Sequence, residues 1–253
     1  MAASLPFLLL TRPRASSEQF LRQLEGDEVT GFVPILSPAL TIKPILPAPK
    51  LPQGAGLILT SANAVAAYRA LGGRPVAPCF VVGPATAEAA RAEGFDPISA
   101  DGNADDLVAL ILGMAPDLAP DAKLVHLHGT HTRGNVVERL RRGGVMAEGL
   151  AIYDQPAQEL SDLAQQALKG ALPVVLPLFS PRSAAQVAKA CRAADAPLFV
   201  AAMSAQVSLA LDGIYLQGLD IPKRPDGRLM RQSVGKLLKM AATLVEDRGS
   251  VKG

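Results

Sequence analysis

Short apolar runs alternate with helical patterns along the whole chain. Between the runs, apolar side chains recur at helical spacing, as Phe20, Leu21 and Leu24 do within residues 16–24. Strands that alternate with helices are typical of an α/β fold, in which helices cover a parallel sheet. The runs expected to form strands are "FLLLT" (7–11), "FVPIL" (32–36), "GLILT" (56–60), "CFVVG" (79–83), "LVHLHG" (124–129), "GLAIY" (149–153), "VVLPLF" (174–179), "LFVAAM" (198–203) and "GIYLQ" (213–217).

The pattern contains an internal repeat. "LILTSANAV" around Ser61 aligns with "LPLFSPRSA" around Ser180, at an offset of 119 residues. At nearly the same offset, residues 8–36 resemble residues 125–153, strand for strand. We therefore expect two copies of one α/β unit within the chain.

Pro-rich segments interrupt the alternation at equivalent places in the two copies. The first segment is expected to carry the chain into a separate middle domain, and the second to return it. A single continuous doubly wound domain is the alternative, which the duplication disfavours. We predict two flavodoxin-like domains of about five parallel strands each, with this division: an outer domain at 1–36 and 170–253, an inserted domain at 55–150, and linkers at 37–54 and 151–169.

Composition narrows the function classes. Of the 253 residues, 49% are apolar, and the net charge of only +2 gives no reason to expect binding to nucleic acid or to a membrane. Cys79 and Cys191 have no metal-site spacing, and we expect two buried thiols in a reducing compartment. The N-terminal "LPFLLL" is too short to span a bilayer and lacks the features of a signal peptide, so a cytoplasmic protein is predicted.

Small polar residues follow most of the predicted strands. In open α/β sheets these strand ends border the ligand crevice, next to helix N-termini. Taken singly, Ser, Thr and Asn at such positions are ordinary helix caps. Taken together with two or three arginines, they favour a flexible polyanion held by many modest contacts. No phosphate-binding glycine motif is present, so nucleotide binding is poorly supported.

Candidate catalytic groups are few. The three histidines lie in "HLHGTH", where His126 and His128 can share a strand face, but no fourth ligand stands at metal-site spacing, and no metal is expected. No Ser-His-Asp order or nucleophile elbow occurs. Tyr153 ends the strand "GLAIY", where its phenol can either assist a leaving group or pack against the linker.

The ordered motifs resemble those of the uroporphyrinogen-III synthase family, over most of the chain. The motifs are "TRP", "LILTSANAV", "VVGPATAEAARAEG", "HGTHTRGNVVERLRRGGV", "IYDQ" and "LFSPRSA". The resemblance implies a bilobed protein whose two domains are joined by a two-stranded linker. It implies a cofactor-free lyase that cyclises hydroxymethylbilane, a linear tetrapyrrole with eight carboxylates, to uroporphyrinogen III, with inversion of ring D and loss of water. It also suggests hand-over of substrate from hydroxymethylbilane synthase to a monomeric enzyme.

The resemblance assigns roles to particular residues. Tyr153 matches the family's tyrosine near the reacting end and is expected to give a hydrogen bond or a proton to the departing hydroxyl. Contacts to the substrate carboxylates, by side chain or backbone amide, are expected from Thr11, Arg12, Thr60, Ser61, Asn63, Gly83, Thr86, Gly129, Arg133, Gly134, Ser180, Arg182, Ser183 and Ser204.

One motif departs from the family. Where family members have G-x-x-T-A, this chain reads "AMSAQ", so that Ala202 replaces the glycine and Ser204 stands one residue before the expected threonine. This departure leaves open an alternative function, a non-catalytic paralogue that binds a tetrapyrrole or another polyanion in the same cleft.

Overall fold

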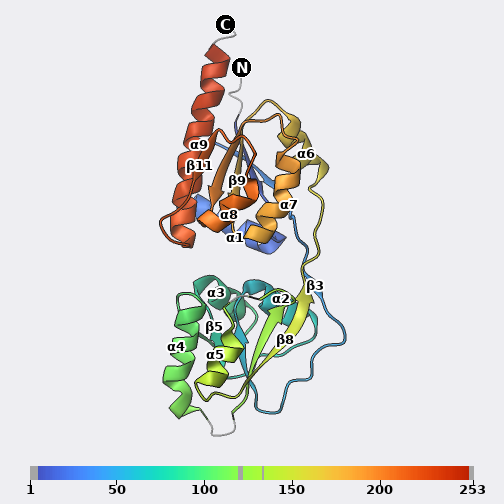
Figure 1. Ribbon diagram of the computed structural model, residues 1–253, viewed down its shortest axis with the longest axis vertical. Helices are drawn as coiled ribbons and strands as arrows, with labels where there is room; N and C mark the ends of the chain where they lie inside the picture. Colours follow the sequence, from blue (N-terminus) through green and yellow to red (C-terminus); the bar gives the residue numbers. More distant parts are fainter. Residues whose placement is uncertain (1–4, 119–121, 133, 251–253) are drawn as a thin grey trace. The chain divides into compact units, whose positions relative to one another are not determined.

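The computed structural model describes residues 5–118, 122–132 and 134–250. The chain divides into two compact units, and the first is discontinuous (Figure 1). Unit 1 comprises Met1–Thr41 and Ala157–Gly253, and unit 2 comprises Ile42–Pro156. Each unit has its own parallel sheet and its own core, so the expected mixed α/β class is confirmed.

Unit 1 contains a five-stranded parallel sheet in the order β11-β10-β9-β1-β2. Numbered along the chain within the unit, this order is 2-1-3-4-5, which is the flavodoxin-like order. Its strands are β1 (Phe7–Leu10), β2 (Val33–Leu36), β9 (Val174–Leu178), β10 (Leu198–Ala202) and β11 (Gly218–Asp220).

Helices cover both faces of the unit 1 sheet because its strands are apolar on both sides. Phe20 and Leu24 of α1 pack with Val234 of α9 on one face, and α6, α7 and α8 cover the other. The helices are α1 (Arg14–Gly26), α6 (Asp162–Lys169), α7 (Pro181–Cys191), α8 (Ala205–Ser208) and α9 (Gly227–Ser250), with a 3-10 turn at Leu209–Leu211.

Unit 2 contains a six-stranded sheet in the order β3-β8-β7-β4-β5-β6. All neighbouring strands are parallel except β3, which pairs antiparallel with β8 at the edge. The strands are β3 (Lys43–Pro44), β4 (Gly56–Leu59), β5 (Cys79–Val81), β6 (Pro97–Ser99), β7 (Leu124–Gly129) and β8 (Ala147–Asp154).

The unit 2 sheet is also covered on both faces. One face packs against α2 (Ala62–Ala70) and α3 (Pro84–Ala92). The other packs against α4 (Ala104–Met114) and α5 (Val136–Arg142), and a 3-10 turn at Ala115–Asp117 follows α4.

The internal repeat corresponds to the two sheets. Strands β8-β7-β4-β5-β6 of unit 2 occupy the places that β2-β1-β9-β10-β11 occupy in unit 1. The flavodoxin-like chain order predicted for both units is nevertheless wrong for unit 2, where the five parallel strands run 3-2-1-4-5. The cause is the order of the duplicated pieces, since the piece with β7 and β8 follows the piece with β4 to β6.

The segment "GIYLQ" (213–217), expected as a strand, is not one. Tyr215 is 84% exposed, and the strand β11 begins only at Gly218. A Cβ at Gly218 would approach within 2.7 Å of the Phe199 ring, so only glycine lets the chain pass this closely beside β10.

The segments expected to be linkers contain regular structure. Strand β3 lies within 37–54, and the range 151–169 contains the end of β8 and all of α6. Within unit 1, Leu40 pairs antiparallel with Ala157, and Gln158 N–H donates to the Ala39 carbonyl at 2.9 Å. The chain therefore leaves unit 1 and returns to it at neighbouring positions.

Candidate functional site

Ligand crevices of open α/β sheets lie beyond the carboxyl ends of the strands, where the direction of winding reverses. In unit 1 this reversal lies between β1 and β9, and in unit 2 between β4 and β7. Six of the fifteen predicted site residues end these four strands or follow them directly: Thr11, Arg12, Thr60, Ser61, Gly129 and Ser180.

In unit 2, Tyr153 on β8 contacts the end of β4. Its Oη lies 3.1 Å from Ser61 Oγ. Ser61 is the N-cap of α2 and accepts the Ala64 N–H at 3.2 Å. Tyr153 is only 6% exposed, and this burial raises the pKa of its phenol above the usual value, while hydrogen bonds from Ser61 and the Gly129 backbone oppose the rise. The phenol therefore stays protonated at neutral pH and can act as a proton donor.

Gly129 is the residue against which the Tyr153 ring packs. A Cβ at Gly129 would lie 2.7 Å from Cε2 and 2.8 Å from Cζ of that ring. Because real side chains do not approach so closely, any larger residue would displace the phenol. The close approach of the ring accounts for the glycine without any contact to a ligand.

On the opposite face of the same sheet, Thr60 Oγ1 lies 3.0 Å from His126 Nε2. Burial lowers the pKa of His126 to about 4, with the neighbouring His128 contributing, so His126 is neutral at physiological pH. His128 Nδ1 lies 2.7 Å from the Gly129 carbonyl oxygen. Among the described residues, no group of three His, Cys, Asp or Glu side chains is placed to hold a metal ion.

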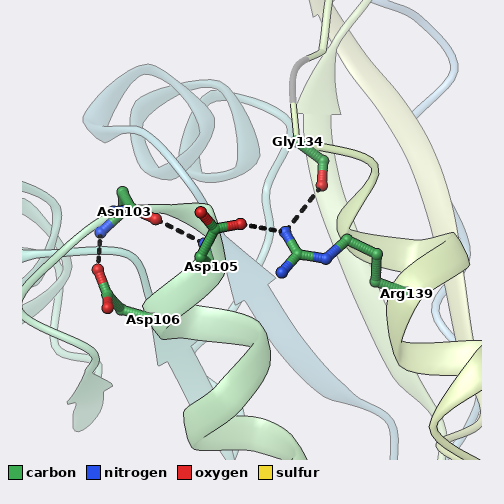
Figure 2. A network of polar contacts seen from close by, with 5 residues as sticks. All are labelled: Asn103, Asp105, Asp106, Gly134 and Arg139. Atoms are coloured by element: carbon green, nitrogen blue, oxygen red, sulfur yellow. Dashed lines mark hydrogen bonds and ion pairs between the residues drawn. The ribbon is translucent and has the colours of Figure 1, made fainter.

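Gly134, which follows β7, contacts a polar network at the N-terminus of α4 (Figure 2). Asn103 and Asp106 form a capping box, and Asp105 accepts from Arg139 Nη1 at 2.7 Å. The same Nη1 lies 3.4 Å from the carbonyl oxygen of Gly134. Gly134 has φ +84°, where only glycine is unstrained, and a Cβ there would meet the Ala104 side chain at 2.6 Å.

The remaining predicted residues of unit 2 lie at helix N-termini. Gly83 is the N-cap of α3, and its carbonyl accepts the Thr86 N–H at 3.1 Å. Thr86 itself is buried, while Asn63 is half-buried in the first turn of α2. Arg133 lies outside the described residues.

In unit 1, Arg12 and Phe179 form the centre of the strand-end group. The Arg12 guanidinium carbon lies 4.3 Å from the centroid of the Phe179 ring, and Phe20 packs edge-on against that ring. Burial lowers the pKa of Arg12, but the arginine remains charged at neutral pH. Thr11 is 2% exposed, so its side chain belongs to the core of the unit.

Ser180 and Ser183 form a cap at the start of α7. Ser180 Oγ accepts the Ser183 N–H at 3.2 Å, and the two hydroxyls lie 2.8 Å apart. Arg182 is half-buried in the same turn. Ser204 precedes the short helix α8, and its side chain makes no capping hydrogen bond there.

Within unit 2 the structure brings Tyr153, Ser61 and Gly129 into contact, and within unit 1 it brings Ser180 and Ser183 into contact. Two contributors were not predicted, His126 as the partner of Thr60 and Phe179 as the support of Arg12. Phe179 is the last residue of the apolar run 174–179 and directly precedes Ser180. Its place at the strand end was the sequence feature that could have identified it as part of the site. No helix in the described part of the chain is both long and apolar enough to cross a bilayer.

The fold of the chain is similar to that of a solved protein. A solved structure of uroporphyrinogen-III synthetase from Helicobacter pylori 26695 is similar in fold, with TM-score 0.51 and 15% identity over 95% of this chain and 100% of that one. A mutant uroporphyrinogen III synthase from the extremely thermophilic bacterium Thermus thermophilus is 17% identical, with TM-score 0.46, over 93% of this chain and 99% of that one.

No curated protein matches the chain. The family model described as uroporphyrinogen-III synthase HemD, however, matches residues 22–229, which is most of the sequence. The chain therefore belongs to the uroporphyrinogen-III synthase family.

Proposed function

We propose that this chain is a cofactor-free lyase that cyclises hydroxymethylbilane to uroporphyrinogen III. The match of the family model to residues 22–229 is the observation that carries the proposal. The strand-end groups support it, because they offer one protonated phenol and many hydrogen-bond donors. The substrate supplies its own nucleophile, a pyrrole carbon, so the protein has to fold the chain and assist departure of one hydroxyl.

Tyr153 is the proposed proton donor. Loss of the terminal hydroxyl as water leaves an azafulvene cation, which the substituted carbon of ring D attacks. The resulting spiro intermediate fragments and recloses with ring D inverted. A phenol that remains protonated at neutral pH is suited to the first step, since a poor leaving group must be protonated as it departs.

The other strand-end residues are proposed to hold the substrate carboxylates. In unit 1 the candidates are Arg12 and the first turn of α7, where Ser180 and Ser183 lie at the positive end of the helix. In unit 2 they are the N-termini of α2 and α3, with Asn63 and Gly83. Each contact contributes little binding free energy, so substrate binding depends on many groups together.

The direct test is incubation of the purified chain with freshly prepared hydroxymethylbilane, with heat-inactivated chain as the control. After oxidation, chromatography separates the type I and type III isomers. We expect type III from the active chain and type I, the product of spontaneous closure, from the control. Type I alone from both samples would reject the proposed activity.

A non-catalytic paralogue that binds a tetrapyrrole or another polyanion is the second candidate. The departure at Ala202–Gln206 favours it, because Ala205 has no hydroxyl at the position of the family threonine, and Ser204 makes no capping hydrogen bond at α8. Tight binding of uroporphyrinogen III without formation of the type III isomer would identify this function.

A further inference from the structure

A β-bulge turns Tyr153 toward Ser61. His128 of β7 is paired with Ala151 of β8, but the next residue, Gly129, is paired with Tyr153, so Ile152 is an extra residue in β8. Side chains alternate between faces along a strand, and Tyr153 would otherwise lie on the face opposite to Ile152. Because of the bulge, both side chains lie in the core beneath α2 and α3. Bulges beside active sites commonly redirect a side chain in this way.

The Tyr153 oxygen then lies beside a hydrogen-bond donor, because Ser61 Oγ is 3.1 Å away. Ser61 Oγ accepts the Ala64 N–H at 3.2 Å, which polarises its own O–H and makes it a better donor. A phenol oxygen that accepts from Ser61 leaves its own proton free for a further partner.

We propose that Ser61 is a positioning residue for Tyr153, and that its hydroxyl stabilises the phenolate that forms when Tyr153 gives up its proton. This arrangement resembles an oxyanion hole formed around a protein side chain. Ser61 then acts in the catalytic step and does not bind a substrate carboxylate. This inference rests on the proposed function.

The proton balance of the step is complete within substrate and protein. The O–H bond of Tyr153 breaks, and its proton passes to the departing hydroxyl oxygen of hydroxymethylbilane. The carbon–oxygen bond breaks, water leaves, and the positive charge stays on the substrate while the hydroxyl of Ser61 stabilises the phenolate. When the macrocycle closes, the unsubstituted carbon of ring D forms the last bond and loses its proton, which returns to the phenolate.

The test compares two serines that cap helices in the same manner. Ser61 caps α2 by accepting from Ala64, and Ser161 caps α6 by accepting from Ala164. Ser61→Ala and Ser161→Ala should therefore lose similar amounts of stability, while only Ser61→Ala lowers kcat, by about 10-fold with KM nearly unchanged. In the Tyr153→Phe background, Ser61→Ala should have almost no further effect, because the two residues act as a unit.

Two other variants keep the test open if Ser61→Ala does not fold. Ser61→Gly also removes the hydroxyl and is tolerated better at an N-cap, and Ser61→Thr, which keeps it, should restore kcat. A raised KM at unchanged kcat in Ser61→Ala, or a full additive loss in the Tyr153→Phe background, would show instead that Ser61 binds substrate.

An independent measurement needs no turnover. In protein labelled with 13C at the tyrosine ring, the resonance that is absent from Tyr153→Phe identifies Tyr153, and its titration reports the phenol. Removing the Ser61 hydroxyl should raise the pKa of Tyr153, and Ser161→Ala should not. An unchanged Tyr153 titration in Ser61→Ala overturns the positioning role even if type III is formed. A shifted titration in a protein that forms only type I upholds it while the proposed activity fails.

Discussion

His126 is a buried histidine, and its burial favours the neutral form in the folded protein. It is 4% exposed and bonded to Thr60 through Nε2, and its pKa falls from 6.5 to about 4. The unfolded chain therefore binds a proton that the folded chain does not between these two values. The stability that this residue contributes is present above pH 6.5 and is lost as the pH falls toward 4.

We expect the free energy of unfolding to decrease with acidification by up to about 3 kcal/mol through His126 alone. Urea unfolding at a series of pH values, compared between the wild type and His126→Gln, measures this contribution as the difference in slope. His131→Gln, which removes an exposed histidine, serves as the control and should follow the wild-type curve. Equal slopes in the wild type and His126→Gln would contradict the assignment.

Cys79 and Cys191 should be chemically inert in the folded protein. Burial raises the pKa of each thiol to about 12, so the reactive thiolate is nearly absent at neutral pH. We expect no alkylation by iodoacetamide at about pH 8 in native protein, because that pH lies far below the raised pKa, and two modified cysteines after denaturation, as counted by mass spectrometry. Rapid labelling of the native protein would indicate that one of the cores opens readily.

At the scale of single residues, the sequence predicted where polar groups lie but not what they touch. Ser61 and Thr60 were expected at a strand end, and they are there. That Ser61 contacts Tyr153 depends on the bulge at Ile152, and no local pattern of side chains shows one extra residue in an otherwise regular strand. Gly129 was expected to contact the ligand. The structure gives another reason for a glycine at this position, because the Tyr153 ring leaves no room for a Cβ.

At the scale of elements, the network around Arg139 holds the loop after β7. The pair with Asp105 is largely exposed, so it contributes less than about 1 kcal/mol to stability. We expect Arg139→Ala to leave the unfolding free energy nearly unchanged but to accelerate amide hydrogen exchange at Gly134 and Asn135.

The chain offers a close control for this experiment. Arg69 likewise joins a carboxylate, Glu93, and a glycine carbonyl, that of Gly73, within the same unit. Arg69→Ala should leave exchange at Gly134 at the wild-type rate. If both variants change exchange there equally, the effect is general to unit 2 and does not come from the network.

Strands that consist of an apolar run were predictable, because both faces of these sheets are covered. The short strands β3 and β6 were missed, since "KP" and "PIS" each contain a proline and have no apolar run. Conversely, the run "GIYLQ" looks like a strand but leaves Tyr215 in solvent, because pairing with β10 starts only where a glycine can pass Phe199.

At the scale of the whole molecule, unit 2 is an insertion between two parts of unit 1. The ends of the insertion are adjacent, as the pairing of Leu40 with Ala157 shows. We expect residues 42–156 to fold alone, and residues 1–41 to fold when joined to 157–253 through an Asn-Gly turn. Circular dichroism with thermal unfolding tests both fragments, and a gradual, non-cooperative transition in either would contradict their independence.

The sequence repeat predicted two similar units, and the sheets correspond strand for strand. The repeat did not predict the different order of the strands in the unit 2 sheet. A repeat shows which segments are alike, but it does not show which strands are neighbours in a sheet. The structure also places the crossings between the units elsewhere than predicted, at residues 41/42 and 156/157. Helix α6 was counted with a linker, although Ala164 and Leu168 belong to the unit 1 core.

The discontinuity of unit 1 has a consequence for biosynthesis. Strand β1 is translated before unit 2, yet its neighbour β9 begins only at Val174, after all of unit 2 has been translated. Unit 2 is therefore complete and able to fold while Leu8, Leu9 and Leu10 still lack one side of their sheet. Until β9 emerges, β1 is an apolar segment of the kind that chaperones bind.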